Sequence, residues 1–167
     1  MKNAPVLKTA VRALFGVAWL LDGAWKFQPG MADIFVSMTN QSISMHPAIL
    51  QPWASFWAGQ VAANPNLFVL LIGALELVLG LALIFGFMRK ITYTGGILLS
   101  LLVWDIAEGL GGVFMAGVTD VGAGIVYVYV FLLLIIIEAT YGTSRYSLDY
   151  YIEKRFGWWK KLAELKY

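Results

Sequence analysis

Three carboxylates lie within one of the most apolar stretches of the chain. Asp105, Glu108 and Asp120 fall in residues 104–129, which also hold six glycines, at positions 109, 111, 112, 117, 122 and 124. An acid inside a bilayer costs about 2.5–3.5 kcal/mol, so acids this close together need cations, water or protons beside them. Carboxylates that are kept partly protonated can take up and release protons. The glycines predict a tight, irregular crossing between two closely packed helices.

Other charged residues interrupt the remaining apolar stretches. Asp22 and Lys26 lie one helical turn apart, so an intrahelical ion pair is available to them. Glu76 lies near the middle of the second apolar stretch, where an ionisable residue is a functional candidate, although an ion pair with Arg12 would give it a purely structural role. We expect the outer acids to form one acidic corner, in which Lys26 is the only cation.

The composition excludes several kinds of redox site. The chain has no cysteine, which rules out disulfides, thiolate-bound iron–sulfur clusters and cysteine nucleophiles. Its single histidine, His46, cannot alone supply a two-histidine haem site or a zinc triad. We therefore expect no haem, iron–sulfur or metal site in this chain. A lone loop histidine is more often structural than functional.

The composition also predicts an all-α membrane protein. Of the 167 residues, 60% are hydrophobic and 13% are charged, and the mean hydropathy is +0.74. A membrane-spanning helix takes about 20 residues. We predict a four-transmembrane-helix bundle in residues 1–141, with spans at about 9–27, 66–88, 92–109 and 121–140. In this reading Arg89 and Lys90 end the second span.

Residues 28–64 between the first two spans differ in character. Prolines divide them into two short amphipathic stretches, 31–45 and 48–63, with His46 at the break. Neither is long enough to span the hydrocarbon, so we expect interfacial or re-entrant helices. Trp53 and Trp57 are spaced to lie together at the level of the lipid headgroups.

The basic residues fix the predicted orientation through the positive-inside rule. They flank the first span at its start, lie between spans two and three, and follow span four, whereas the two opposite loops have none. Both termini are therefore expected in the cytoplasm of a multi-pass plasma-membrane protein. The tail, 142–167, is expected to lie as an interfacial helix on the inner leaflet. The inner basic residues are Lys2, Lys8, Arg12, Arg89, Lys90, Arg145, Lys154, Arg155, Lys160, Lys161 and Lys166.

Helical periodicity predicts which faces pack together. On the second span, Gly73 and Gly80 share the face of Glu76 and allow a neighbouring helix to approach closely. On the first span, one narrow arc contains Arg12, Gly16, Trp19, Gly23 and Lys26. On the fourth span, one face contains Asp120, Gly124, Tyr127, Phe131, Leu134 and Glu138.

Three segments resemble a known family. Residues 12–27 (RALFGVAWLLDGAWKF) are similar to the first-span pattern of the DoxX-like membrane proteins, and residues 73–90 (GALELVLGLALIFGFMRK) to their second-span signature. Residues 119–134 (TDVGAGIVYVYVFLLL) are closer to the DoxD branch, the membrane subunit of archaeal thiosulfate:quinone oxidoreductase. The resemblance implies oxidation of thiosulfate to tetrathionate at the outer face, with electrons passed to a membrane quinone.

The resemblance also implies a set of site residues. Arg12, Lys26, Glu76 and Asp120 match its motif positions, and the burial argument adds Asp22, Asp105 and Glu108. We expect Lys26, Asp22, Asp105, Glu108 and Asp120 to serve the chemistry. A quinone entering between spans would lie near Glu76 and Arg12, beside the rings of Trp104, Tyr127 or Tyr129.

The expected partners are membrane lipid, quinone, a second small membrane subunit and a terminal oxidase complex, but not nucleic acid. The residues are also compatible with two other functions. A chain without a prosthetic group of its own can be a non-catalytic subunit that stabilises a terminal quinol oxidase or another respiratory complex. It can also be a small transporter, although no internal repeat or pair of broken helices supports that reading.

Overall fold

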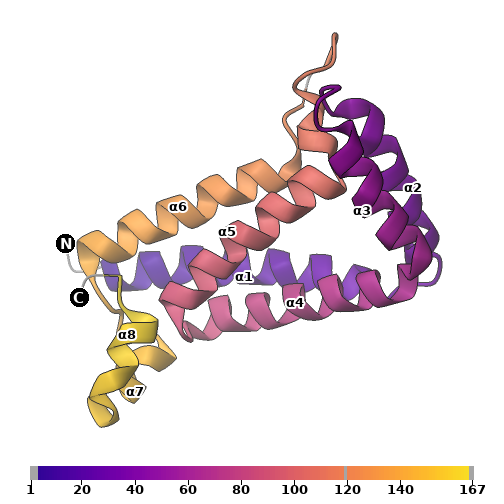
Figure 1. The fold of residues 1–167 in the computed structure, drawn as a ribbon. Coiled ribbons are helices and arrows are strands. Elements are labelled where there is room, and N and C mark those ends of the chain that lie inside the picture. The colour runs from indigo at the N-terminus through magenta and orange to yellow at the C-terminus, as the bar shows by residue number, and fades with distance from the viewer. Residues whose placement is uncertain (1–3, 119, 166–167) are drawn as a thin grey trace.

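The chain folds into helices joined by turns and, between η1 and α6, by a longer loop (Figure 1). The computed structural model describes residues 4–118 and 120–165, so Lys2 and Lys166, two of the predicted inner basic residues, and Thr119 lie outside the described residues. Within those ranges there are helices and no strands, which confirms the all-α prediction. The elements are α1 (Ala4–Trp25), α2 (Met31–Met45), α3 (Gln51–Ala63), α4 (Pro65–Phe85), α5 (Arg89–Ile106), η1 (Gly109–Gly112), α6 (Ala123–Tyr141), α7 (Leu148–Arg155), η2 (Gly157–Trp159) and α8 (Lys160–Ala163).

The four long helices α1, α4, α5 and α6 occupy the positions of the predicted spans, with ends that differ by a few residues. Of these, α4 and α6 are long and apolar enough to cross a membrane. Helices α2 and α3 lie across one end of the long helices, which we call the cap end (Figure 1). The N-terminus, the C-terminus, α7 and α8 lie at the opposite end, which we call the tail end.

The turn between α4 and α5 corrects one prediction. Arg89 and Lys90 do not end the helix of the predicted second span; they begin α5, because α4 already ends at Phe85. Gly86 caps α4 in the left-handed conformation (φ 63°), and Met88 also has a positive φ of 45°. Glycine is the residue that adopts this conformation without a Cβ penalty, and it is common just after a helix end.

Small residues hold α1 against α4, as their spacing predicted. A Cβ added to Gly16 would lie 2.7 Å from the carbonyl oxygen of Gly80, and one added to Gly80 would lie 2.8 Å from that of Gly16. Further along the same pair, a Cβ on Gly23 would lie 3.0 Å from the carbonyl oxygen of Gly73. The two backbones therefore approach at a distance that only glycine permits.

An aromatic core joins this pair to α5 and α6. Phe131 of α6 is fully buried and lies against Gly96 of α5, where any side chain would overlap its ring. The edge of Phe15 meets the Phe131 ring at 4.9 Å between centroids, and Trp19 lies 5.9 Å from it. Rings packed edge to face stabilise a core beyond the area they bury.

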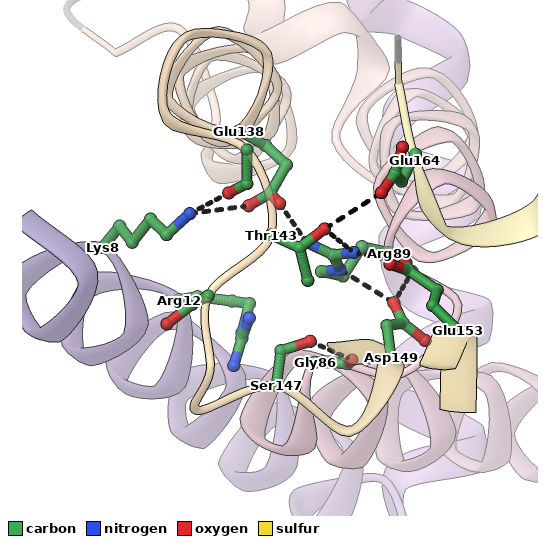
Figure 2. A network of polar contacts seen from close by, with 12 residues as sticks. Lys8, Arg12, Gly86, Arg89, Glu138, Thr143, Ser147, Asp149, Glu153 and Glu164 are labelled. Atoms are coloured by element: carbon green, nitrogen blue, oxygen red, sulfur yellow. Dashed lines mark hydrogen bonds and ion pairs between the residues drawn. The ribbon is translucent and has the colours of Figure 1, made fainter. Parts of the chain in front are cut away.

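The tail is fastened to the bundle by a buried polar network (Figure 2). Asp149, at the start of α7, accepts hydrogen bonds from the backbone N–H of Met88 at 2.8 Å and from that of Arg89 at 3.0 Å. Trp159 adds a third bond from Nε1 at 2.9 Å. The described part of residues 142–167 therefore packs onto the α4–α5 turn.

Arg89 is the centre of this network and is completely buried. Its guanidinium contacts Glu138 of α6, Asp149 at 2.8 Å and Glu153 at 3.1 Å. Burial raises the pKa of Glu153 to about 7, against the opposing charge of Arg89, and the neighbouring carboxyl of Glu164 adds to the rise. An arginine offers five donors in a rigid fork, which suits it to hold several carboxylates at once.

Candidate functional site

A largely buried ion pair in the half of the bundle nearest the cap joins the end of α1 to α4. Lys26 follows the last residue of α1, and its Nζ lies 3.4 Å from Oε2 of Glu76. Glu76 is buried in the middle of α4. Gly73 makes the approach possible, since a Cβ there would lie 2.9 Å from the Cβ of Lys26. Glu76 therefore pairs with Lys26 and not with Arg12, the alternative that the sequence left open.

A second polar pair lies beside the first. The hydroxyl of Tyr127 donates to Oδ2 of Asp22 at 3.1 Å, which joins α6 to α1. Among the described residues Asp22 forms no ion pair with Lys26, although the spacing allowed one. The Tyr127 ring packs against Trp19 at 5.3 Å and Phe15 at 5.4 Å between centroids. Two carboxylates, one amine and one phenol thus meet next to the aromatic core.

Several buried polar atoms of the bundle and the cap make no hydrogen bond within the described part of the chain. They are Nε1 of Trp19, Oε2 of Glu76 and Oγ of Ser100 in the bundle, and Nε1 of Trp57 under the cap. Oε2 of Glu76 is one of them, because its contact with Nζ of Lys26 is an ion pair without hydrogen-bond geometry. Such atoms are rare in folded proteins and are commonly satisfied by ordered water or a ligand. The interior near Lys26 and Glu76 therefore has hydrogen-bonding capacity for molecules other than the protein.

Asp105 takes part in a different group, at the junction of α5 with the cap. Its Oδ1 lies 2.8 Å from Nε2 of His46, and its Oδ2 accepts a hydrogen bond from Nε1 of Trp53 at 2.8 Å. His46 is buried, and its Nδ1 lies 2.7 Å from the carbonyl oxygen of Ser42. A structural role was expected for His46, and neither of its contacts nor that of Trp53 with Asp105 was predicted. Residues so distant in sequence carry no signal of contact.

Glu108 and Asp120 satisfy backbone groups near the start of α6. Oε2 of Glu108 accepts from the backbone N–H of Gly124 at 2.9 Å, and Oδ1 of Asp120 accepts from that of Gly122 at 3.1 Å. A carboxylate at a helix N-terminus satisfies free N–H groups and interacts favourably with the helix dipole. Asp120 is exposed to solvent, outside the bundle interior.

The predicted acidic corner is therefore divided in the structure. Asp105, Glu108 and Asp120 each have their own partners, and Asp22 lies with Tyr127 beside the Lys26–Glu76 pair. Arg12 is at the tail end, where its Nε donates to the carbonyl oxygen of Leu83 at 2.7 Å. The structure thus brings together four predicted site residues, which are Lys26, Glu76, Asp22 and Tyr127.

The aromatic residues expected beside a quinone are scattered. Trp104 donates from Nε1 to the carbonyl oxygen of Val121 at 2.7 Å, so it braces the loop before α6. Tyr127 belongs to the aromatic core, whereas Tyr129 is largely exposed, at 61% of its surface. These three rings do not form one pocket.

An apolar cavity opens instead between α4 and α5. Its part under the cap, about 200 Å³, is lined by Phe35, Trp57, Val61, Phe68, Leu71, Ile72, Leu75, Leu99, Leu102, Val103, Ile106 and Ala107. A groove of about 430 Å³ continues along α4 and α5 and shares Leu75, Leu99 and Leu102 with it. Together they form a channel from the surface of the bundle to the underside of the cap.

No group of three or more His, Asp and Glu side chains suited to a metal ion occurs in residues 4–118 and 120–165. Comparison of the chain with models of protein families, with curated proteins and with solved structures gives no match. The function must therefore be argued from the geometry of the site.

Proposed function

We propose that this chain is a four-span membrane protein with the tail end in the cytoplasm and the cap end outside. All four long helices expose large apolar side chains, for example Leu14 of α1, Val78 of α4, Leu98 of α5 and Ile136 of α6. A surface of this kind is suited to lipid and is unusual for a soluble monomer. The distribution of positive charge supports the orientation, since the basic residues of α7 and α8 all lie at the tail end.

We further propose that it is the membrane subunit of a thiosulfate:quinone oxidoreductase. In that reaction two thiosulfates join through a new sulfur–sulfur bond to give tetrathionate and release two electrons. One quinone takes up these electrons together with two protons to form the quinol. The protein must therefore supply an anion site near the outer face, a path for protons and access for an apolar acceptor.

The observation that carries the proposal is the group of Lys26, Glu76, Asp22 and Tyr127. Lys26 is the only lysine or arginine between Arg12 and Arg89 in the sequence and lies toward the cap, and thiosulfate is a dianion. Glu76, buried beside it with an oxygen that pairs with Lys26 but accepts no hydrogen bond within the described residues, is suited to hold or pass on a proton in a low-dielectric site. Tyr127 and Asp22 extend the hydrogen-bonded group toward α6.

The channel between α4 and α5 supplies access for the quinone in this proposal. Its walls are apolar over nearly their whole length, and it opens on the surface that we assign to lipid. The end under the cap lies beside Trp57, whose buried N–H has no hydrogen-bond partner among the described residues. A quinone carbonyl is an acceptor for such a donor, and the groove can hold an isoprenoid chain.

A second function is favoured by the contacts of the outer acids. Asp105, Glu108 and Asp120 all bond groups of the protein itself, as expected of acids that hold a structure together. A non-catalytic subunit that stabilises a terminal quinol oxidase or another respiratory complex would need nothing more. Both proposals include a second small membrane subunit and a terminal oxidase complex as partners.

The test is reduction of a quinone by the purified chain with thiosulfate as donor, at acidic pH, alone and with its membrane partners. For the enzyme we expect activity that Lys26→Ala abolishes in a protein that still purifies intact. Asp120→Asn should have a smaller effect, because Asp120 is exposed and bonds only a loop. Absence of activity in every combination, together with loss of an oxidase complex on deletion of the chain, would establish the structural role instead.

A further inference from the structure

The surroundings of His46 require a proton that a neutral histidine and an ionised aspartate do not supply. Both ring nitrogens face oxygen atoms, Nδ1 at 2.7 Å from the carbonyl oxygen of Ser42 and Nε2 at 2.8 Å from Oδ1 of Asp105. A carbonyl oxygen can only accept, so Nδ1 carries hydrogen and donates. The contact between Nε2 and Oδ1 then needs a second hydrogen, borne by the imidazole or by the carboxyl group.

The position of His46 at the end of α2 favours an imidazolium over a protonated Asp105. Oδ2 accepts the N–H of Trp53 at 2.8 Å, so both carboxylate oxygens act as acceptors when His46 is an imidazolium. His46 also follows the last residue of α2 as its C-cap, where the helix leaves carbonyl groups unpaired. A cation at a helix C-terminus interacts favourably with the helix dipole, which adds to the attraction of Asp105.

We infer that His46 and Asp105 form a proton-binding site that fastens the cap to the end of α5. The site connects three elements: His46 ends α2, Trp53 belongs to α3, and Asp105 belongs to the last turn of α5. Ser42 strengthens the same junction by donating from Oγ to the carbonyl oxygen of Ile106 at 2.7 Å. Removal of the shared proton leaves one of the two ring nitrogens facing an acceptor without a hydrogen, so one of these bonds is lost.

The helices that pack against this junction carry few other charges. On α4 the one charged residue is Glu76, which pairs with Lys26. Helix α3 and η1 have no Asp, Glu, Lys or Arg, and the one charged residue of α2 is Asp33 in its first turn. The chain after α5 adds Glu108, whose carboxylate is held by the backbone of Gly124. Asp105 is therefore the charged group in direct contact with His46 within the described residues.

The site controls the cover of the apolar cavity. Trp57 and Val61 of α3 and Phe35 of α2 form the part of the cavity wall that belongs to the cap. With the proton bound, α2 and α3 stay on α5 and the cavity is covered. Loss of the proton loosens the cap and opens the cavity toward the side that we assign to the exterior.

The first test is a titration of His46 by NMR on ¹⁵N-histidine-labelled full-length protein, which gives one imidazole because the chain has one histidine. We expect hydrogen on both ring nitrogens at about pH 5 and a titration midpoint that moves to lower pH in Asp105→Asn. The matched control Asp33→Asn, on the exposed side of α2, should leave the midpoint where it is. A bare ring nitrogen at pH 5 in the wild type, or equal midpoints in wild type and Asp105→Asn, would overturn the inference.

The second test measures the cap. Because the chain has no cysteine, Val61→Cys and Ala62→Cys each carry one thiol, the first buried at 1% exposure and the second on the exposed side of α3. The ratio of their labelling rates removes the ordinary pH dependence of thiol chemistry. We expect this ratio to rise by about tenfold as His46 loses its proton, as for loss of a charged hydrogen bond. If the ratio of the two labelling rates stays constant across the titration of His46, the inference that this proton holds the cap in place is wrong. Neither test involves thiosulfate or quinone, so the result is independent of the proposed function.

Discussion

The carboxylate of Asp149 binds Arg89 twice: Oδ2 accepts from the backbone N–H at 3.0 Å and from Nε at 2.8 Å. Both residues are fully buried at the tail end of the bundle. One aspartate therefore neutralises a buried arginine and also satisfies free backbone groups at the start of α5. The remainder of the guanidinium contacts Glu138, Glu153 and the hydroxyl of Thr143 (Figure 2).

Asp149→Ala should destabilise the protein by about 3–5 kcal/mol, because it leaves Nε of Arg89 and the backbone N–H groups of Met88 and Arg89 without their acceptor in a buried site. Asp149→Asn keeps an acceptor for one of these bonds and should cost less. Thermal unfolding in detergent measures both. The exposed Asp33→Asn serves as the control and should change stability by less than about 0.5 kcal/mol. Equal effects of Asp149→Ala and Asp33→Asn would refute the role of the tail network.

Two adjacent glycines of α5 provide a test of the core. Gly96→Ala should destabilise the protein by about 1–3 kcal/mol, because the new methyl group overlaps the ring of Phe131 and the core must move. Gly95→Ala meets nothing within 4 Å and should be neutral or slightly stabilising. The two variants are compared by thermal unfolding, and similar melting temperatures would show that the α5–α6 contact is looser than described.

Glu153 makes stability depend on pH. Its pKa in the folded protein is raised to about 7, mainly by burial, from an ordinary value of 4.5. Between these values the folded state holds a proton that the unfolded state has released, so stability falls as pH rises through this window and is level above it. Glu153→Gln should remove this part of the slope in unfolding experiments between about pH 4.5 and 8. A slope identical to that of the wild type would contradict the assignment.

The proposed orientation predicts which residues reagents can reach. Ile49, between α2 and α3, is 87% exposed, and Tyr151 of α7 is 64% exposed. In intact cells a membrane-impermeant maleimide should label Ile49→Cys at once and Tyr151→Cys only after permeabilisation. Both variants have a single thiol, since the natural chain has none. Labelling of both residues from the same side would rule out the four-span arrangement.

Periodicity predicted the helices and their packing faces well. The buried face of α1, the glycine seam with α4 and the buried side of α6 follow from residues spaced three or four apart, since one helical face is read from local sequence. The start and end of α2 were also predicted, because glycine and proline mark helix boundaries locally.

The partners of the charged residues were not predictable in the same way. The spacing placed Lys26 within reach of Asp22, but Lys26 instead contacts Glu76, which belongs to a different helix, α4. Arg89 looked like a helix-ending charge, but Asp149 and Glu138 bury it. Contacts of this kind depend on how helices and the tail meet in space, which spacing along one helix does not encode.

The measurement that tests the account most directly is thiosulfate-dependent quinone reduction by wild type, Glu76→Gln and Asp33→Asn in the same liposomes. If the buried carboxylate of Glu76 handles protons beside Lys26, Glu76→Gln should lower the rate by about 10²–10⁴-fold, the usual contribution of a general acid or base. Asp33→Asn, which changes an acid at the surface of the cap, should retain full activity. Equal rates for wild type and Glu76→Gln would contradict a catalytic role for this group and leave the structural subunit as the better reading.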